Sequence, residues 1–131
     1  MDRKINIALI GTGRMGSVHV GNLARRVPEA NLCALCDIRL DVAQKVGQEN
    51  GITRVVRDYH ELLDDPIIEA VAIITSTDTH AQIIIDAAKA GKHIFCEKPI
   101  ALDIDSIRQA LQEVENAGVK LQVGFNRRFD K

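Results

Sequence analysis

The sequence of 131 residues predicts an α/β fold in which helices cover a parallel sheet. Short apolar runs alternate with segments of helical periodicity along the whole chain, and parallel strands require such crossover connections. The first apolar run, residues 5–10, leads directly into glycines at G-x-G-x-x-G spacing. The run at residues 70–74 is continuously apolar, which is typical of a strand that is covered on both faces.

The first half of the chain supplies three strands and two helices. Residues 5–10 are the first strand, and the helix after the glycines repeats apolar residues at the spacing i, i+3, i+4, i+7, namely Val20, Leu23, Ala24 and Val27. Residues 31–36 are the second strand. The next helix has a narrow apolar stripe at Leu40, Ala43 and Val46 and ends at Gly51. Residues 54–56 form a short third strand.

The second half continues the alternation. A helical turn at residues 59–63 is followed by the strand at 70–74, a helix at 79–89 that ends at Gly91, and a strand at 93–96. Asp103 is a suitable N-cap for a helix that runs to Gly118, and residues 120–123 are the sixth strand. Right-handed crossovers then predict the strand order 3-2-1-4-5-6. This is a doubly wound six-stranded sheet, a Rossmann fold that spans residues 1–131 as a single domain.

Composition excludes several classes of protein. The net charge is −1, and Arg25-Arg26 and Arg127-Arg128 are only pairs, so nucleic-acid binding has little support. No apolar run is long enough to span a bilayer, and no signal peptide is evident, so we expect no membrane association and a cytoplasmic protein. The three cysteines are an odd number, which argues against a disulfide framework.

Two patterns that suggest metal or redox chemistry are set aside. Cys33 and Cys36 form a C-x-x-C pair, but both lie in a predicted strand, where residues three apart point to opposite faces. We therefore interpret them as small buried hydrophobes. His19, His60 and His93 show no metal-ligand spacing with one another or with the cysteines, so no metal is predicted.

The glycine-rich turn predicts a dinucleotide site. Gly11 permits a tight turn, Gly13 allows close approach of a pyrophosphate, and Gly16 lets the helix pack closely on the strand. The free amides and the dipole of the helix start favour the phosphates. Asp37 ends the second strand, 21 residues after Gly16, where its carboxylate can accept hydrogen bonds from two ribose hydroxyls and repel a 2′-phosphate. The alternative is a strand–turn–helix with purely structural glycines.

Three segments should meet at the carboxyl edge of this sheet: the glycine turn, residues 75–80, and Glu97-Lys98-Pro99. Together with Asp37 and residues 124–129 they resemble the Gfo/Idh/MocA oxidoreductase family, and residues 75–80 and 126–130 look most like its inositol 2-dehydrogenases. The resemblance covers the whole chain but only the N-terminal half of a family member. It implies that the C-terminal substrate domain is absent here, and that the chain alone binds NAD without turnover.

The resemblance implies a set of site residues. The cofactor-binding residues are Gly11, Thr12, Gly13, Arg14, Met15, Gly16, Asp37, Arg39, Ser76, Thr77, His80, Glu97, Lys98, Asn126 and Arg127. Backbone groups around Thr12, Arg14 and Met15 would hold the pyrophosphate, with Arg39 beside the adenine. Ser76, Thr77 and His80 would flank the middle of the cofactor, and Asn126 and Arg127 the mouth of the site.

Lys98 is the predicted catalytic residue, with Glu97 beside it near the nicotinamide ribose. We expect a cis bond between Lys98 and Pro99, since an X-Pro bond adopts cis at a small cost of roughly 0.5–1 kcal/mol. Plainer interpretations remain for three positions: His80 as a polar residue in a first helical turn, Lys98 as a surface lysine, and Arg127 with its neighbour as a solvated pair.

The implied function is hydride transfer between a secondary alcohol of a polyol, such as inositol, and NAD. A non-catalytic module that senses NAD or binds it structurally is the alternative. Lys98 favours an enzyme, because a sensor needs no group at the reacting carbon. The carboxyl edge and the sixth strand would be bare in this chain, so we also expect a homo-oligomer.

Overall fold

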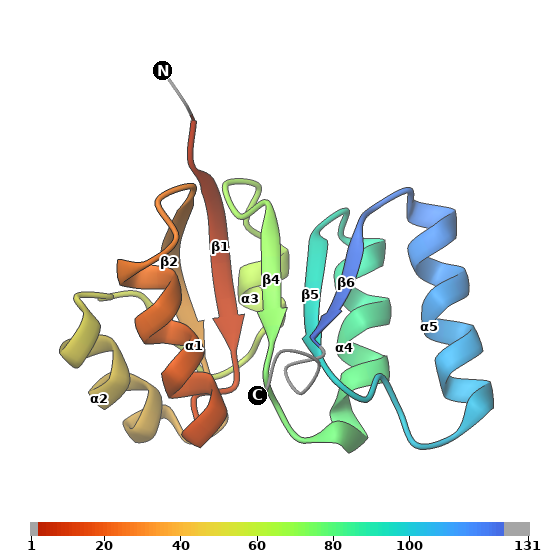
Figure 1. Cartoon of the computed structure of the whole chain (residues 1–131), viewed down its shortest axis with the longest axis horizontal. Helices are drawn as coiled ribbons and strands as arrows, with labels where there is room; N and C mark the ends of the chain where they lie inside the picture. Colours follow the sequence, from red (N-terminus) through yellow and green to blue (C-terminus); the bar gives the residue numbers. More distant parts are fainter. Residues whose placement is uncertain (1–2, 125–131) are drawn as a thin grey trace, which may run out of the picture.

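The computed structural model describes residues 3–124 and contains one sheet of six strands. The strands are β1 (Ile5–Ile10), β2 (Ala30–Cys36), β3 (Val55–Val56), β4 (Ala70–Ile73), β5 (His93–Glu97) and β6 (Leu121–Gly124). Every pairing is parallel, and the order is β3-β2-β1-β4-β5-β6, which confirms the predicted topology (Figure 1). All carboxyl ends therefore lie at one edge.

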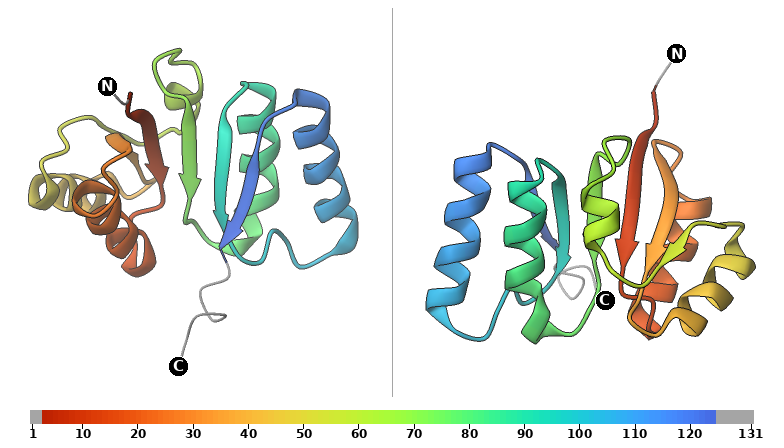
Figure 2. Two further views of the ribbon diagram at one scale, coloured as in Figure 1. Left: turned by 45° about the horizontal axis from the view of Figure 1, so that its top comes forward. Right: turned by 180° about the vertical axis from the view of Figure 1, so that it is seen from behind.

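Helices cover the two faces of the sheet unequally. Helices α1 (Arg14–Arg25) and α2 (Leu40–Asn50) lie on one face, over the β1 to β3 half (Figure 1). Helices α3 (His60–Leu63), α4 (Thr77–Lys89) and α5 (Ile104–Ala117) lie on the other (Figure 2). Strands β1 to β5 each contribute to two cores, one on each face of the sheet. In β1, Ala8 and Ile10 pack toward α3, α4 and α5, whereas Leu9 packs toward α1 and α2.

Most predicted boundaries hold. Asp103 caps α5, since its Oδ2 accepts a hydrogen bond of 2.9 Å from the amide of Ser106. The bond between Lys98 and Pro99 is cis, as expected. Helix α4 begins at Thr77, two residues earlier than predicted, with Ser76 as its extended N-cap. The run of Ser and Thr before it offers several residues that suit an N-cap, so sequence alone did not fix the start.

The prediction for Cys33 and Cys36 is wrong in one respect. The register between β1 and β2 shifts after Ile7, so that one residue of β2 is left without a partner at Cys33. This bulge breaks the alternation, and both thiols pack against the same core. Burial raises the pKa of Cys33, and raises that of Cys36 to about 12, so both remain protonated. Their interpretation as small apolar groups is consistent with these shifts.

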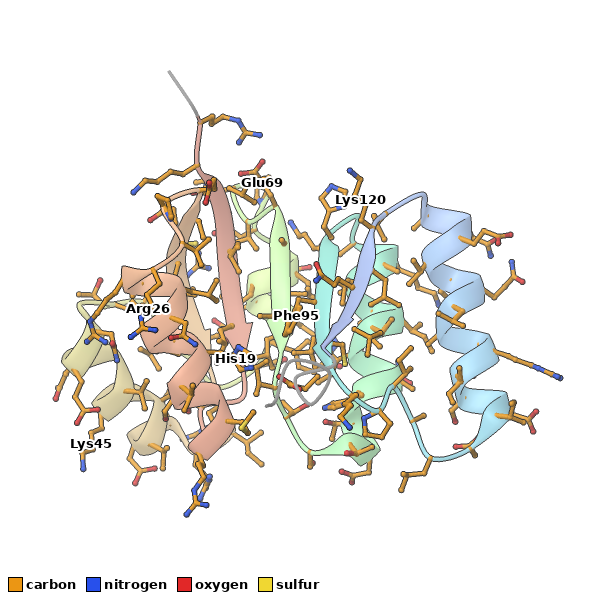
Figure 3. The ribbon with its side chains drawn as sticks, viewed as in Figure 1. His19, Arg26, Lys45, Glu69, Phe95 and Lys120 are labelled. Atoms are coloured by element: carbon orange, nitrogen blue, oxygen red, sulfur yellow. The ribbon has the colours of Figure 1, made fainter. Side chains whose placement is uncertain are left out.

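The β4 to β6 part of the sheet is open on the α1 side: Figure 1 shows no helix of the described residues in front of it. A cavity of about 670 Å³ lies on this face and is lined in part by Ala72, Phe95 and Leu121. Figure 3 shows His19 of α1 next to Phe95 at its border, and their ring centroids are 5.6 Å apart. The expected association of chains, which rests on a bare carboxyl edge and a bare sixth strand, stays a prediction. Within residues 3–124, no helix is long and apolar enough to cross a membrane.

Candidate cofactor-binding site

Two cavities of about 520 and 420 Å³ lie at the carboxyl edge of the sheet, where β1 and β4 are neighbours. Both are lined by Gly13 and by residues 74–76, so they form two halves of one groove. The larger half contains Asp37 and Arg39, and the smaller half contains Glu97 and Lys98. The connection after β1 leads toward the β3 edge of the sheet, whereas the connection after β4 leads toward the β6 edge. The groove therefore lies at the switch point at which doubly wound sheets bind ligands.

The three glycines of the turn differ in what surrounds them. Gly11 has φ +100°, and a Cβ there would lie 2.7 Å from the backbone of Ile74. A Cβ on Gly16 would lie 1.8 Å from the carbonyl oxygen of Gly11, so the start of α1 packs directly on the end of β1. Apart from its two chain neighbours, a Cβ on Gly13 would meet no atom of residues 3–124 within 4 Å. Gly13 therefore leaves an open cradle that a side chain would fill.

The start of α1 suits an anion. Gly13 is its N-cap, no side chain caps it, and its first turn has no acidic residue. The amide of Ser17 donates to the carbonyl oxygen of Gly13 at the start of the helix, so the amides before Ser17 have no acceptor within α1. Arg14 and Met15 line the smaller cavity beside this cradle. The residues present thus fit a diphosphate group.

Asp37 is held in place by three hydrogen bonds. Its Oδ2 accepts from the amide and from the hydroxyl of Thr12, both at 2.9 Å, and its Oδ1 accepts from the amide of Arg39 at 2.9 Å. Burial works to raise the pKa of Asp37, but these hydrogen bonds outweigh it and lower the pKa below the ordinary value of 3.8. The side chain is therefore a carboxylate at neutral pH. Because the amide of Thr12 already donates to Asp37, it is not free to bind a pyrophosphate. The pyrophosphate contacts that we expect from the main chain are therefore left to the residues after Thr12.

His80 lies in the first turn of α4, but it is almost fully buried, with 1% of its surface exposed. Its Nδ1 is 2.8 Å from the carbonyl oxygen of Pro99, and its Nε2 is 2.9 Å from that of Thr75. The ring therefore joins the loop after β4 to the loop after β5. Both ring nitrogens face main-chain oxygens, so only the carbon atoms of the ring are left to contact a cofactor. The expected contact between His80 and the cofactor stays a prediction.

Glu97 has a partner that the sequence did not reveal. Its Oε2 lies 2.7 Å from Nε2 of His19, and both side chains are largely buried. This pair ties the end of β5 to α1, directly before Lys98. The partners are 78 residues apart in the chain, so no local spacing signals the contact. Lys98 itself is exposed, lines the smaller cavity, and has no ion-pair partner within residues 3–124.

The larger cavity holds further residues that sequence reasoning missed. Ile38 is 81% exposed although it is a large apolar residue, and it lines the cavity with Arg57, Tyr59 and Gln82. An apolar side chain kept at the rim suits one face of a flat ring such as adenine. Its position immediately after Asp37 is the signal that points to it.

The remaining predicted residues are placed as follows. Ser76 and Thr77 line the smaller cavity, and Arg39 lines the larger one. Asn126 and Arg127 lie outside the described residues.

Burial raises the pKa of Cys96, beneath the site, to about 12, so its thiol is no nucleophile. In the part of the chain that the structure describes, no group of three or more His, Cys, Asp or Glu side chains is placed to hold a metal.

The fold and the groove together define a dinucleotide-binding domain. The parallel sheet, the glycine turn, the open helix start and the carboxylate at the end of β2 are the parts that such a domain requires.

The chain belongs to the Gfo/Idh/MocA oxidoreductase family. The family model, described as an oxidoreductase family with an NAD-binding Rossmann fold, matches residues 5–125. The domain is accordingly an NAD-binding one, as predicted.

Within this family, the chain is similar to inositol dehydrogenases. The chain is 40% identical over 127 residues to myo-inositol 2-dehydrogenase of Thermotoga maritima, and 43% identical over 130 residues to scyllo-inositol 2-dehydrogenase (NAD(+)) of Bacillus subtilis. These alignments cover 97% and 99% of this chain but 38% of each relative. The chain thus spans little more than a third of the length of these relatives, which is less than the half that the resemblance implied.

The chain is also similar in structure to an inositol dehydrogenase. Scyllo-inositol dehydrogenase from Lactobacillus casei, with bound cofactor NAD(H) and scyllo-inositol, superposes with a TM-score of 0.91 at 35% identity. The match covers 98% of this chain and 38% of that one.

Proposed function

We propose that this chain is the NAD-binding part of a dehydrogenase that transfers a hydride between a secondary alcohol of inositol, or a similar polyol, and NAD. The observation that carries the proposal is that Lys98 lines the same cavity as the open cradle at Gly13. A cation that shares one groove with a diphosphate cradle suits catalysis next to the cofactor. The similarity to inositol dehydrogenases supports the polyol as substrate class.

The residues of the groove divide the work of binding. The Asp37 carboxylate accepts a hydrogen bond from the adenosine ribose, and the first amides of α1 hold the diphosphate. Ile38 lies against the adenine. Bound NAD would supply the hydride acceptor, which no side chain can provide.

Lys98 handles the reacting oxygen. As the hydride departs, the alcohol gives its hydroxyl proton to a base that we place in the part of the relatives outside the aligned region, and negative charge develops on this oxygen during the transfer. The Lys98 ammonium donates a hydrogen bond to it and stabilises that charge. The segment that carries Lys98 is fixed on both sides: His19 holds Glu97 before it, and His80 meets the carbonyl of Pro99 after it. Such support keeps a catalytic group within the narrow range of useful positions.

Cofactor binding by this chain is the first test. NADH and NADPH are titrated into the protein while nicotinamide fluorescence is followed, and NADH should bind more tightly. Asp37→Ala should narrow the difference, because it removes both the ribose hydrogen bond and the repulsion of a 2′-phosphate. Asp41 is an exposed acidic residue in the first turn of α2. The variant Asp41→Ala is therefore the matched control and should leave the affinities for NADH and NADPH unchanged. Equal binding of the two cofactors by the unaltered chain contradicts the role given to Asp37.

Turnover is the second test. The chain alone should form no NADH from inositols at high protein concentration, since lost positioning of substrate costs many powers of ten in rate. A protein that joins this chain to the remaining part of the Bacillus subtilis relative should form NADH. If the joined protein binds NADH normally and stays inactive with every polyol, the chain is better described as a cofactor-sensing module.

A further inference from the structure

We propose that Thr12 is a positioning residue that sets the preference of this domain for NAD over NADP by holding the Asp37 carboxylate. The inference rests on the NAD(H) preference proposed above and assigns it to a second residue. Thr12 lies between Gly11 and Gly13, but its side chain faces away from the diphosphate cradle toward β2, where it meets Asp37.

Thr12 makes this contact from a buried position. Thr12 is 1% exposed, and both its amide and its hydroxyl donate to the same oxygen, Oδ2 of Asp37, at 2.9 Å. Two donors on one oxygen fix the direction of the carboxylate more firmly than one, since rotation of the Asp37 side chain breaks both bonds at once. With the amide of Arg39 on Oδ1, three of about four acceptor positions are filled, and the free one is on Oδ1.

The charge next to Asp37 explains why holding it matters. Arg39 follows two residues later, is exposed, and lines the same cavity. A guanidinium attracts a 2′-phosphate, whereas a carboxylate repels it, so the two side chains favour opposite cofactors. A carboxylate that is free to turn can move away from the phosphate and leave Arg39 to bind it. Thr12 removes that freedom, because its two hydrogen bonds keep the negative charge beside the ribose.

Thr12→Val tests this directly, because it replaces the hydroxyl by a methyl group of similar size and keeps the amide. The ratio of the NADPH to the NADH dissociation constant, measured by nicotinamide fluorescence with this chain, should fall about tenfold, as expected when one hydrogen bond to a charged group is lost. Thr12→Ser keeps the hydroxyl and should restore the ratio to within about twofold, which a purely space-filling role would not predict.

A double-mutant cycle separates this role from general damage to the fold. Combined with Asp37→Ala, the Thr12→Val change should leave the ratio unaltered, because Thr12 acts through Asp37. A ratio unchanged by Thr12→Val alone, or changed equally in the presence and absence of Asp37, overturns the inference. If the unaltered chain shows no preference, the proposed NAD(H) selectivity fails with it; if the preference is present and Thr12→Val keeps it, only the role of Thr12 fails.

Discussion

Gly13→Ala should separate cofactor binding from folding, because the structure leaves room for the methyl group only where the diphosphate is expected. The backbone at Gly13 has φ −69° and ψ −158°, an extended conformation that is open to alanine. Apart from the chain neighbours, no atom in the described part of the chain would lie within 4 Å of the added Cβ. The loss of a good N-cap and the reduced entropy of the unfolded chain act in opposite directions. The free energy of unfolding should therefore change by no more than about 0.5 kcal/mol.

NADH binding should suffer much more. The added methyl group lies where a phosphate must approach the amides of α1, so at least one hydrogen bond to a charged group is lost. Such a bond contributes about 1.5–3 kcal/mol, which corresponds to roughly 10- to 150-fold weaker binding. Urea unfolding gives the stability, and nicotinamide fluorescence gives the affinity.

Two glycines of the same helix serve as controls. In Gly21→Ala, the added Cβ would lie 3.2 Å from the end of the flexible Arg25 side chain, and this change should leave NADH binding unchanged. Gly16→Ala should damage the fold itself, because its Cβ would lie 1.8 Å from the Gly11 carbonyl oxygen. If Gly13→Ala binds NADH as tightly as the unaltered chain, the phosphates do not lie at this cradle and the site is misplaced.

Three further predictions concern catalysis, acid sensitivity and stability. In the protein joined to the rest of the Bacillus subtilis relative, Lys98→Met should keep NADH affinity within about threefold and lower turnover at least ~100-fold in steady-state assays; undiminished turnover would make Lys98 a surface lysine. The lowered pKa of Asp37 gives stability that is complete above its ordinary value of 3.8 and is lost as pH falls through the lower pKa of the folded state. The difference in unfolding free energy between the unaltered chain and Asp37→Asn should therefore shrink from pH 7 to about pH 3, and a constant difference would refute the linkage. Lys92 is buried and donates to two main-chain carbonyl oxygens at 2.7 Å, so Lys92→Met should destabilise the fold by about 2–4 kcal/mol in urea unfolding; exposed Lys89→Met is the control, and an equal effect of the two changes would contradict the role of Lys92.

The parts of the fold that sequence predicted are those that depend on local physics. The strand order followed from alternating elements and right-handed crossovers, and the turn followed from glycines after an apolar strand. The Asp103 cap needed only a residue type at a helix start. Local patterns did not fix the start of α4, because several neighbouring residues suit the N-cap position. They also missed the bulge at Cys33, because the pairing with β1 shifts the register there.

The candidate site shows the same division. Sequence alone determined which residues meet at the carboxyl edge of the sheet, because parallel strands bring their ends together whatever the side chains are. Only the tertiary structure decided how these residues are held. His19 meets Glu97, His80 joins two loops, and Thr12 fixes Asp37, through contacts between residues that are 78, 19 and 25 positions apart. Such contacts depend on the direction of each side chain in the packed domain, and no periodicity along the chain records that direction.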